Sequence, residues 1–437
     1  MTQILPDLDG RLALPGDAAY DDARRGWNLA VDQRPAAVAH AASAVDVQAV
    51  VRHARAVDLR VAPQATGHGS EALDLDALRG AILLKTAGLD AIAIDPAART
   101  ATVGAGVTAG ALAEAAAAHG LAPVLGVAPS VGVAGLVLGG GLGWLSRTHG
   151  RAASGLLAAE VVTADGERRA ADDDLLLALR GGGGRGVIAT SLTLALHPVD
   201  ELFGGMVAWP GEHAAEVLEQ VRRVALDAPE CLSLIFRVLS LPPLDVIPAP
   251  IRGRRIAAVV AVHAGPRADA EHALAPLRAT GGALLDTCGA IGPADLVRVA
   301  GDPEQPVPAR GEGLLLRELT PATVGAIAAV ADDHREALTV LEVRQLGGAL
   351  ARDGLTAPFQ VFVGGAGDSP EATAATLAAA ADVRARLARW TAPRVPLASC
   401  GVGADVARGY ADGAWERLAA IRDAVDPDRR FLSQHDE

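Results

Sequence analysis

Lysine and cysteine are scarce in this chain of 437 residues. Lys85 is the single lysine, which leaves little room for Schiff-base chemistry, and the three cysteines are Cys231, Cys288 and Cys400. Their odd number and wide spacing argue against a disulfide framework and against a CxxC metal site. No histidine pair has the HxH or HExxH spacing of metal ligands, so we expect no metal. We expect the cysteines to be buried structural residues.

Long apolar runs and blocks of like charge are also missing. The net charge of −13 disfavours binding to nucleic acid and to anionic membranes. The first residues, MTQILPDLDG, lack the basic and apolar regions of a signal peptide. The most apolar stretch, 121–146, is interrupted by Pro123, Pro129 and several glycines, so it does not predict a membrane span. We therefore expect a cytoplasmic monomer or homodimer that binds neither nucleic acid nor membrane.

The periodicities predict an α+β fold in which strands and helices alternate irregularly. Before residue 200 the sequence predicts a helix over 44–58, a strand over 81–85 and a hairpin that turns at Asp165-Gly166. Beyond Pro198 it predicts strands at 204–209, 256–264, 338–346 and 358–363, helices at 211–226, 267–279 and 369–390, and a loop over 288–312. We divide the chain into a first domain (1–199), a second domain (200–400) and a C-terminal segment (401–437) that returns to the first.

Glycine, in contrast, is abundant and clustered at 64–70, 126–135, 139–143 and 181–186. Glycine is favoured where the backbone turns sharply or where another molecule approaches it closely, and groups of bare amides bind anions. The stretch GAGVTAG at 104–110 has GxGxxxG spacing and no acidic residue about 20 positions later, which argues against a Rossmann site. We interpret Gly104 and Gly106 as a tight turn between a strand and a helix.

No aspartate or glutamate occurs from 115 to 159, which includes the densest glycine cluster. A surface loop in so acidic a protein would be expected to carry acids. A backbone that lies beside a diphosphate excludes them, because a desolvated carboxylate next to phosphate is costly. The pattern indicates a buried dinucleotide ligand, although a glycine-rich packed core is the alternative.

Three stretches, PSVGVAGLVLGGGLGWLSRTHG, LLAAEVVTADG and LLLALRGGGGRGVIATSLTLALHPV, resemble the flavin domain of berberine bridge enzyme-like oxidoreductases. That family belongs to the vanillyl-alcohol oxidase superfamily and has a two-subdomain FAD-binding domain of the p-cresol methylhydroxylase type. The resemblance is continuous over about 24–200 and patchy beyond. It implies a second, α+β substrate domain with an antiparallel sheet.

The resemblance also implies how FAD is held. The amides after the third element bind the diphosphate, and His68 stands where the family forms a covalent bond to the flavin ring. The implied cofactor-binding residues are Gln64, Ala65, Thr66, Gly67, His68, Gly69, Ser70, Pro129, Ser130, Val131, Gly132, Gly135, Gly139, Gly140, Gly143, Val162, Gly186 and Val187.

Several positions depart from the family pattern. Gln64 replaces an arginine, and Ala65 and Thr66 replace glycines. Ala128 stands where many relatives carry a second, cysteinyl attachment, so we expect a single bond through His68. Near the C-terminus, GYADG gives Tyr410 without the family's following asparagine.

Three functions fit these features. The first is an FAD-dependent oxidase or dehydrogenase that takes hydride from a small, apolar or polycyclic secondary metabolite and passes electrons to O2 or another acceptor. The second is a flavin-dependent cyclase of natural products, and the third is a binding protein that has lost catalysis. For the first, we expect the proton acceptor to be Tyr410, with Glu342, Arg344 and Gln360 as weaker candidates because their strands resemble the floor of the family's site.

Overall fold

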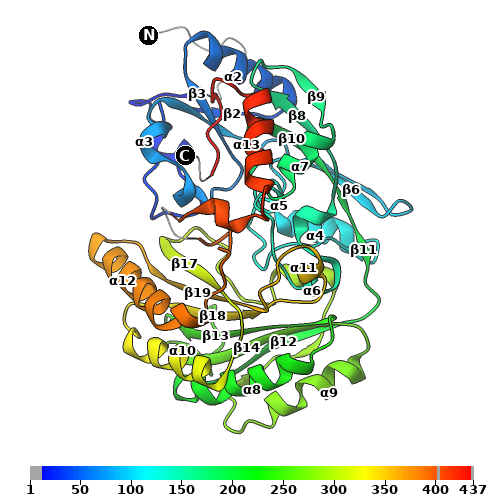
Figure 1. The fold of residues 1–437 in the computed structure, drawn as a ribbon, viewed down its shortest axis with the longest axis vertical. Coiled ribbons are helices and arrows are strands. Elements are labelled where there is room, and N and C mark those ends of the chain that lie inside the picture. The colour runs from blue at the N-terminus through cyan, green and yellow to red at the C-terminus, as the bar shows by residue number, and fades with distance from the viewer. Residues whose placement is uncertain (1–11, 401–403, 435–437) are drawn as a thin grey trace.

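The computed structural model describes residues 12–400 and 404–434, which form two halves built on separate sheets. The two halves lie one above the other in Figure 1. The upper half begins with a four-stranded sheet in the order β1-β2-β4-β3, whose strands β2, β4 and β3 run parallel. The strands are β1 (Leu12–Ala13), β2 (Ala37–His40), β3 (Arg60–Gln64) and β4 (Ala81–Lys85).

Helix α2 (Ala44–Ala56) connects β2 to β3 and packs on this sheet. The Ser43 side chain accepts a hydrogen bond from the Asp46 amide, and Asp46 accepts one from the Ser43 amide, which satisfies donors at the start of the helix. Val47, Val50 and Val51 recur on one face and are buried against the sheet.

A second, antiparallel sheet completes the upper half in the order β5-β6-β10-β8-β9. Its strands are β5 (Ile92–Asp95), β6 (Thr100–Gly104), β8 (Leu156–Thr163), β9 (Arg168–Ala170) and β10 (Val187–Ala195). The predicted hairpin turns at Gly166, whose φ of 82° suits glycine. Around this sheet lie the glycine-rich segments with helices α4 (Ala109–Ala117), α5 (Val133–Leu138), α6 (Ser146–His149) and α7 (Asp173–Leu179).

The lower half is a large antiparallel sheet in the order β15-β12-β14-β13-β18-β19-β17, with β16 paired to β12. Helices α8 (Ala214–Asp227), α9 (Arg267–Arg278), α10 (Pro321–Asp333) and α12 (Pro370–Leu387) cover the face turned away from the upper half (Figure 1). Its strands are β12 (Leu202–Pro210), β13 (Leu232–Ser240), β14 (Arg255–Ala264), β15 (Leu285–Asp286), β16 (Gly289–Ala290), β17 (Ala309–Leu316), β18 (Val340–Gln345) and β19 (Phe359–Ala366).

The end of the described chain lies on the upper half. Helix α13 (Ala414–Val425) contacts α7, and its Leu418 and Ile421 join the apolar core of the antiparallel sheet. Phe431 pairs with Val61 of β3, so the chain end adds a short bridge to the first sheet. The start of the predicted C-terminal segment, 401–403, lies outside the described residues.

The predicted α+β class with an antiparallel second sheet is confirmed. The loop predicted over 288–312 is wrong in part, because it contains β16, a 3-10 turn (Pro293–Val297) and the start of β17. The glycines and prolines of this stretch suggested a loop, but a Cβ at Gly311 would overlap the Phe362 ring on β19, so the aromatic side chain fills the space. Among the described residues, no helix has both the length and the apolar character needed to span a bilayer.

Candidate functional site

His68 is held on three sides by residues from separate segments. Its Nδ1 lies 2.9 Å from Thr66 Oγ1, and its Nε2 lies 3.2 Å from Ser130 Oγ. Its ring stacks on Trp27 with centroids 4.1 Å apart and planes 16° from parallel. The imidazole is therefore fixed in position and orientation before any ligand is added.

The protonation state of His68 follows from its surroundings. Burial lowers the pKa of this imidazole from 6.5 to about 4, so the ring is neutral at pH 7. Thr66 Oγ1 accepts a hydrogen bond from the Gly132 amide, which leaves its own proton free to point at His68 Nδ1. A neutral imidazole keeps one nitrogen lone pair, which is what a nucleophile or a hydrogen-bond acceptor requires.

The two glycine loops that the sequence predicts to bind a diphosphate lie against each other. A Cβ at Gly132 would be 2.9 Å from the Cβ of Ala65, so only glycine permits this approach. Ser70, at the end of the first loop, has a buried Oγ with no hydrogen-bond partner among the described residues. A buried hydroxyl without a partner is costly and points to a polar group that the protein alone does not supply. These features fit the phosphates of a dinucleotide.

Behind the first loop lies a buried polar network at the ends of two parallel strands. Gln64 ends β3 and Lys85 ends β4, and Lys85 Nζ donates to Gln64 Oε1 over 2.6 Å. Lys85 also donates to the carbonyl of Arg25 over 2.7 Å. The Gln64 amide in turn donates to Gln33 Oε1 over 2.7 Å.

The glycine clusters 139–143 and 181–186 also lie side by side. The Gly183 amide donates to the carbonyl of Leu138, and a Cβ at Gly181 would lie 3.6 Å from the Cα of Gly140. Tyr410 reaches this cluster, where its hydroxyl donates to the Gly181 carbonyl over 3.1 Å. Burial raises the pKa of Tyr410, although the charges of Arg185 and Arg151 act in the opposite direction.

At some predicted cofactor-binding positions, packing within the protein already explains the type of residue. A Cβ at Gly143 would overlap the Leu125 carbonyl, and one at Gly186 would lie 2.8 Å from Val425 of α13. Val162 and Val187 are buried core residues of β8 and β10. A Cβ at Gly135 would meet nothing within 4 Å, and one at Gly139 would contact the Gly135 carbonyl. Their contacts with a cofactor stay predictions.

The face of the large sheet that looks toward the upper half carries a buried group of charges. Arg237 of β13 pairs across the sheet with Glu342 of β18, and its guanidinium lies 2.8 Å from that carboxylate. Arg237 also pairs with Asp302 at 2.7 Å, and Arg344 with Glu342 at 3.0 Å. Burial opposes ionisation of Glu342, yet Arg344 and Arg237 hold its pKa below the usual value, so the carboxylate is charged.

Gln360 shares this face, because β19 pairs it with Arg344. Its amide donates to Ser399 Oγ over 2.7 Å, so the segment after α12 passes over the sheet at this point. Beside it, a cavity of about 500 Å³ lies between β17 and residues of the stretches 391–400 and 404–408, with Gly313 and Cys400 in its wall. Glu342, Gln360 and Arg344 thus share one face of the large sheet. Tyr410 lies on the C-terminal segment and contacts Gly181 of the upper half instead.

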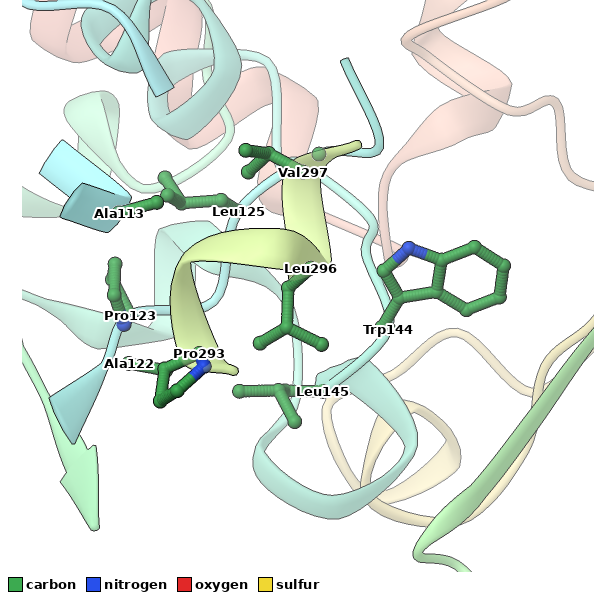
Figure 2. Close-up of a pocket in the computed structure, with 10 residues that line it drawn as sticks. Ala113, Ala122, Pro123, Leu125, Trp144, Leu145, Pro293, Leu296 and Val297 are labelled. Atoms are coloured by element: carbon green, nitrogen blue, oxygen red, sulfur yellow. The ribbon is translucent and has the colours of Figure 1, made fainter. Parts of the chain in front are cut away.

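A smaller cavity of about 10 Å³ lies where the 3-10 turn 293–297 packs on α4 (Figure 2). Leu296 points toward Leu145 there, and the lining is mostly apolar. This space barely holds one water molecule, so it is a packing contact between the halves and not a ligand site.

Comparison with known proteins decides the cofactor. Residues 35–172 match a family described as FAD binding domain. The chain contains an FAD-binding domain. This segment includes both glycine loops around His68, so the unpartnered Ser70 hydroxyl and the glycine contacts belong to the FAD-binding domain.

Curated relatives share this part of the chain. The sequence is 34% identical over 161 residues to the FAD-linked oxidoreductase pytB of Aspergillus terreus, covering 37% of this chain and 20% of that protein. It is 28% identical over 160 residues to (R)-6-hydroxynicotine oxidase of Paenarthrobacter nicotinovorans, covering 37% and 34%. The chain therefore matches about a third or less of the length of these relatives.

Solved structures extend the likeness of fold to the whole chain. The 6-hydroxy-D-nicotine oxidase of Arthrobacter nicotinovorans has a TM-score of 0.84 at 24% identity, covering 100% of this chain and 99% of that one. A variant of the berberine bridge enzyme-like protein 1 of Physcomitrella patens also has a TM-score of 0.84, at 19% identity, covering 98% and 96%. The predicted FAD-binding domain is supported by the family match, and the predicted fold is shared with berberine bridge enzyme-like proteins.

Sequence reasoning missed several residues around His68. Trp27 stacks on its ring, and Glu71 forms a 3.2 Å ion pair with Arg310 of β17. Lys85 was noted only as a rarity, although it supports the loop through Gln64. None of these residues lies in a recognisable motif; the nearest signal is that Glu71 follows His68 by three positions.

Proposed function

We propose that this protein is an FAD-dependent oxidoreductase that takes hydride from a small substrate lying between the FAD-binding domain and the large sheet. The single observation that carries the proposal is the fixed, neutral imidazole of His68 within the glycine loops of the FAD-binding domain. FAD supplies a two-electron acceptor when it is bound. The relatives named as oxidoreductases support the same activity.

His68 is the proposed attachment point of the flavin. It has a lone pair at neutral pH, and Thr66, Ser130 and Trp27 limit its motion. We propose a single histidyl bond, because Ala128 provides no thiol where a second attachment would form. Covalent attachment would prevent loss of the cofactor and favour oxidation of the substrate.

The surface of the large sheet is the proposed substrate side. Ile235 of β13 faces the upper half beside Arg344, so the surface combines apolar and polar groups. The charges of Arg237, Glu342, Arg344 and Asp302 cancel, which favours an uncharged substrate over a strongly ionic one. A small apolar or polycyclic metabolite fits this balance, and a relative named for 6-hydroxynicotine supports a heterocyclic compound.

Proton removal from the substrate is assigned to Tyr410 in this proposal. Its hydroxyl is occupied by the Gly181 carbonyl without substrate, and catalytic hydrogen bonds often form only in the substrate complex. The alternatives are weaker on chemical grounds. Glu342 already binds two guanidinium groups, and the Gln360 amide has no basic lone pair to accept a proton, so both are better suited to orient the substrate.

A denaturing gel viewed under ultraviolet light tests the proposal. The protein band is expected to fluoresce because of attached flavin, and the fluorescence is expected to vanish in His68→Ala while Cys400→Ser keeps it. Anaerobic addition of a substrate is then expected to bleach the yellow protein once per active site. A protein that stays colourless when FAD is supplied contradicts the function, and a yellow protein without in-gel fluorescence contradicts only the covalent bond.

A further inference from the structure

Lys85 is a buried cation without a negative partner. Lys85 is only 6% exposed to solvent. Its ammonium donates two hydrogen bonds to neutral oxygens, Gln64 Oε1 and the Arg25 carbonyl. Among the described residues, no carboxylate forms an ion pair with it. Removing a charge from water without pairing it is costly, so such a group is retained where something else offsets the cost.

The position of Lys85 indicates what offsets that cost. Lys85 and Gln64 are neighbours at the carboxyl ends of parallel strands β4 and β3, where ligands commonly bind in sheets of this type. The loop 64–70 starts there, and a Cβ at Gly67 would lie 3.0 Å from Gln64 Oε1, so the side chain that Lys85 holds also touches the loop. The unpartnered Ser70 hydroxyl at the end of this loop is a second, independent sign of a missing polar ligand.

Other nearby cations are already neutralised. Arg24 is paired with Asp21 and Asp32, and the exposed side chain of Arg25 is paired with Asp22. His40 is the neighbour of Lys85 on β2. Among the described residues behind the loop, Lys85 therefore carries a positive charge that no carboxylate compensates.

We propose that Lys85 is a flavin-binding residue, whose buried ammonium offsets the negative charge of the FAD diphosphate and holds the loop 64–70 through Gln64. The inference rests on FAD being the ligand of this loop. In this role, Lys85 destabilises the folded protein when FAD is absent and stabilises it when FAD is bound. A purely structural lysine would instead stabilise both states.

The test uses the full chain with His68→Ala, so that FAD binds reversibly, and compares Lys85→Met, Lys85→Arg and Arg25→Gln in that background. FAD affinity is measured by quenching of flavin fluorescence, and melting temperature is measured without flavin. Lys85→Met is expected to weaken FAD binding about tenfold or more, while Lys85→Arg, which keeps the charge, stays close to the parent. Arg25→Gln, which removes a nearby surface charge, is the matched control and is expected to leave affinity unchanged.

The melting temperature without flavin distinguishes a flavin-binding role of Lys85 from a purely structural one. Lys85→Met is expected to melt at the same temperature as the parent or higher. The inference is overturned if Lys85→Met binds FAD as the parent does, if it fails to fold or melts lower without flavin, or if Lys85→Arg binds as weakly as Lys85→Met. If the His68→Ala parent binds FAD too weakly for a titration, the amount of flavin bound per protein is compared in the same Lys85 and Arg25 variants with His68 intact. A wild-type protein that takes up no FAD instead refutes the cofactor assignment itself.

Discussion

Ser130 Oγ lies 3.2 Å from Nε2 of His68, although 62 residues separate the two in sequence. The contact joins the loop after β3 to the loop before α5, both within the FAD-binding domain. Thr66 holds the opposite ring nitrogen at 2.9 Å. The imidazole is thus oriented by hydroxyl groups on both edges, and each hydroxyl can be removed without changing the size of the side chain greatly.

Removing either hydroxyl is expected to slow flavin attachment. Thr66→Val and Ser130→Ala each lose one hydrogen bond to His68, worth about 1 kcal/mol, so attachment should slow about fivefold. The measurement adds FAD to flavin-free protein and follows in-gel fluorescence over time. Thr102→Val is the control, because its exposed hydroxyl pairs with Thr193 of β10, away from His68. Rates equal to wild type in both variants contradict the positioning role.

The ion pair between Glu71 and Arg310 is expected to connect the two halves. Both side chains are mostly buried, and Arg310 also donates to the Ala30 carbonyl. Arg310→Gln leaves Glu71 without its partner, so it should lower the free energy of unfolding by about 1–2 kcal/mol. Arg298→Gln, which breaks a more exposed pair with Glu114 across the same boundary, should cost about 0.5 kcal/mol or less. Urea unfolding of the two variants checks this, and equal losses would refute the distinction.

The sequence indicated the parts of the candidate site that lie in glycine motifs. His68, Thr66 and Ser130 stand in glycine loops, whose composition follows from the close approach of one backbone to another. Trp27 and Arg310 were missed because stacking and ion pairing across 41 and 239 positions leave no periodic pattern. Strand β17 was missed for a related reason, because the space beside its Gly311 is filled by a phenylalanine from a different strand.

Tyr410→Phe is expected to reduce the rate of flavin reduction by about a hundredfold or more, as loss of a general base does, with the flavin still attached. Tyr20→Phe is a close control, because these are the two tyrosines of the chain and both hydroxyls donate to a backbone carbonyl. Stopped-flow absorbance under anaerobic conditions gives the rate. If Tyr410→Phe reduces its flavin as fast as Tyr20→Phe, Tyr410 acts through packing on Trp415 and the Gly181 carbonyl, not as a proton acceptor.

The buried ammonium of Lys85 gives the flavin-free protein a distinctive response to pH. Burial lowers the pKa of Lys85 from 10.5 to about 8. Between these values the unfolded chain keeps a proton that the folded chain has released, so stability rises with pH in this window. The gain amounts to about 3 kcal/mol at most by pH 10.5, at about 1.4 kcal/mol per unit, and no further change from this group is expected below pH 8.

Comparison with Lys85→Met isolates that response. Both tyrosines of the chain are present in the two proteins, so their titration cancels in the difference. Urea unfolding of the flavin-free proteins at pH 7, 8.5 and 10 is expected to show Lys85→Met as the more stable at pH 7, with the difference shrinking as pH rises. With FAD bound, the negative charge should keep Lys85 protonated and abolish the rise. A constant difference across the three pH values would mean that Lys85 is not a buried, destabilising cation in the flavin-free fold.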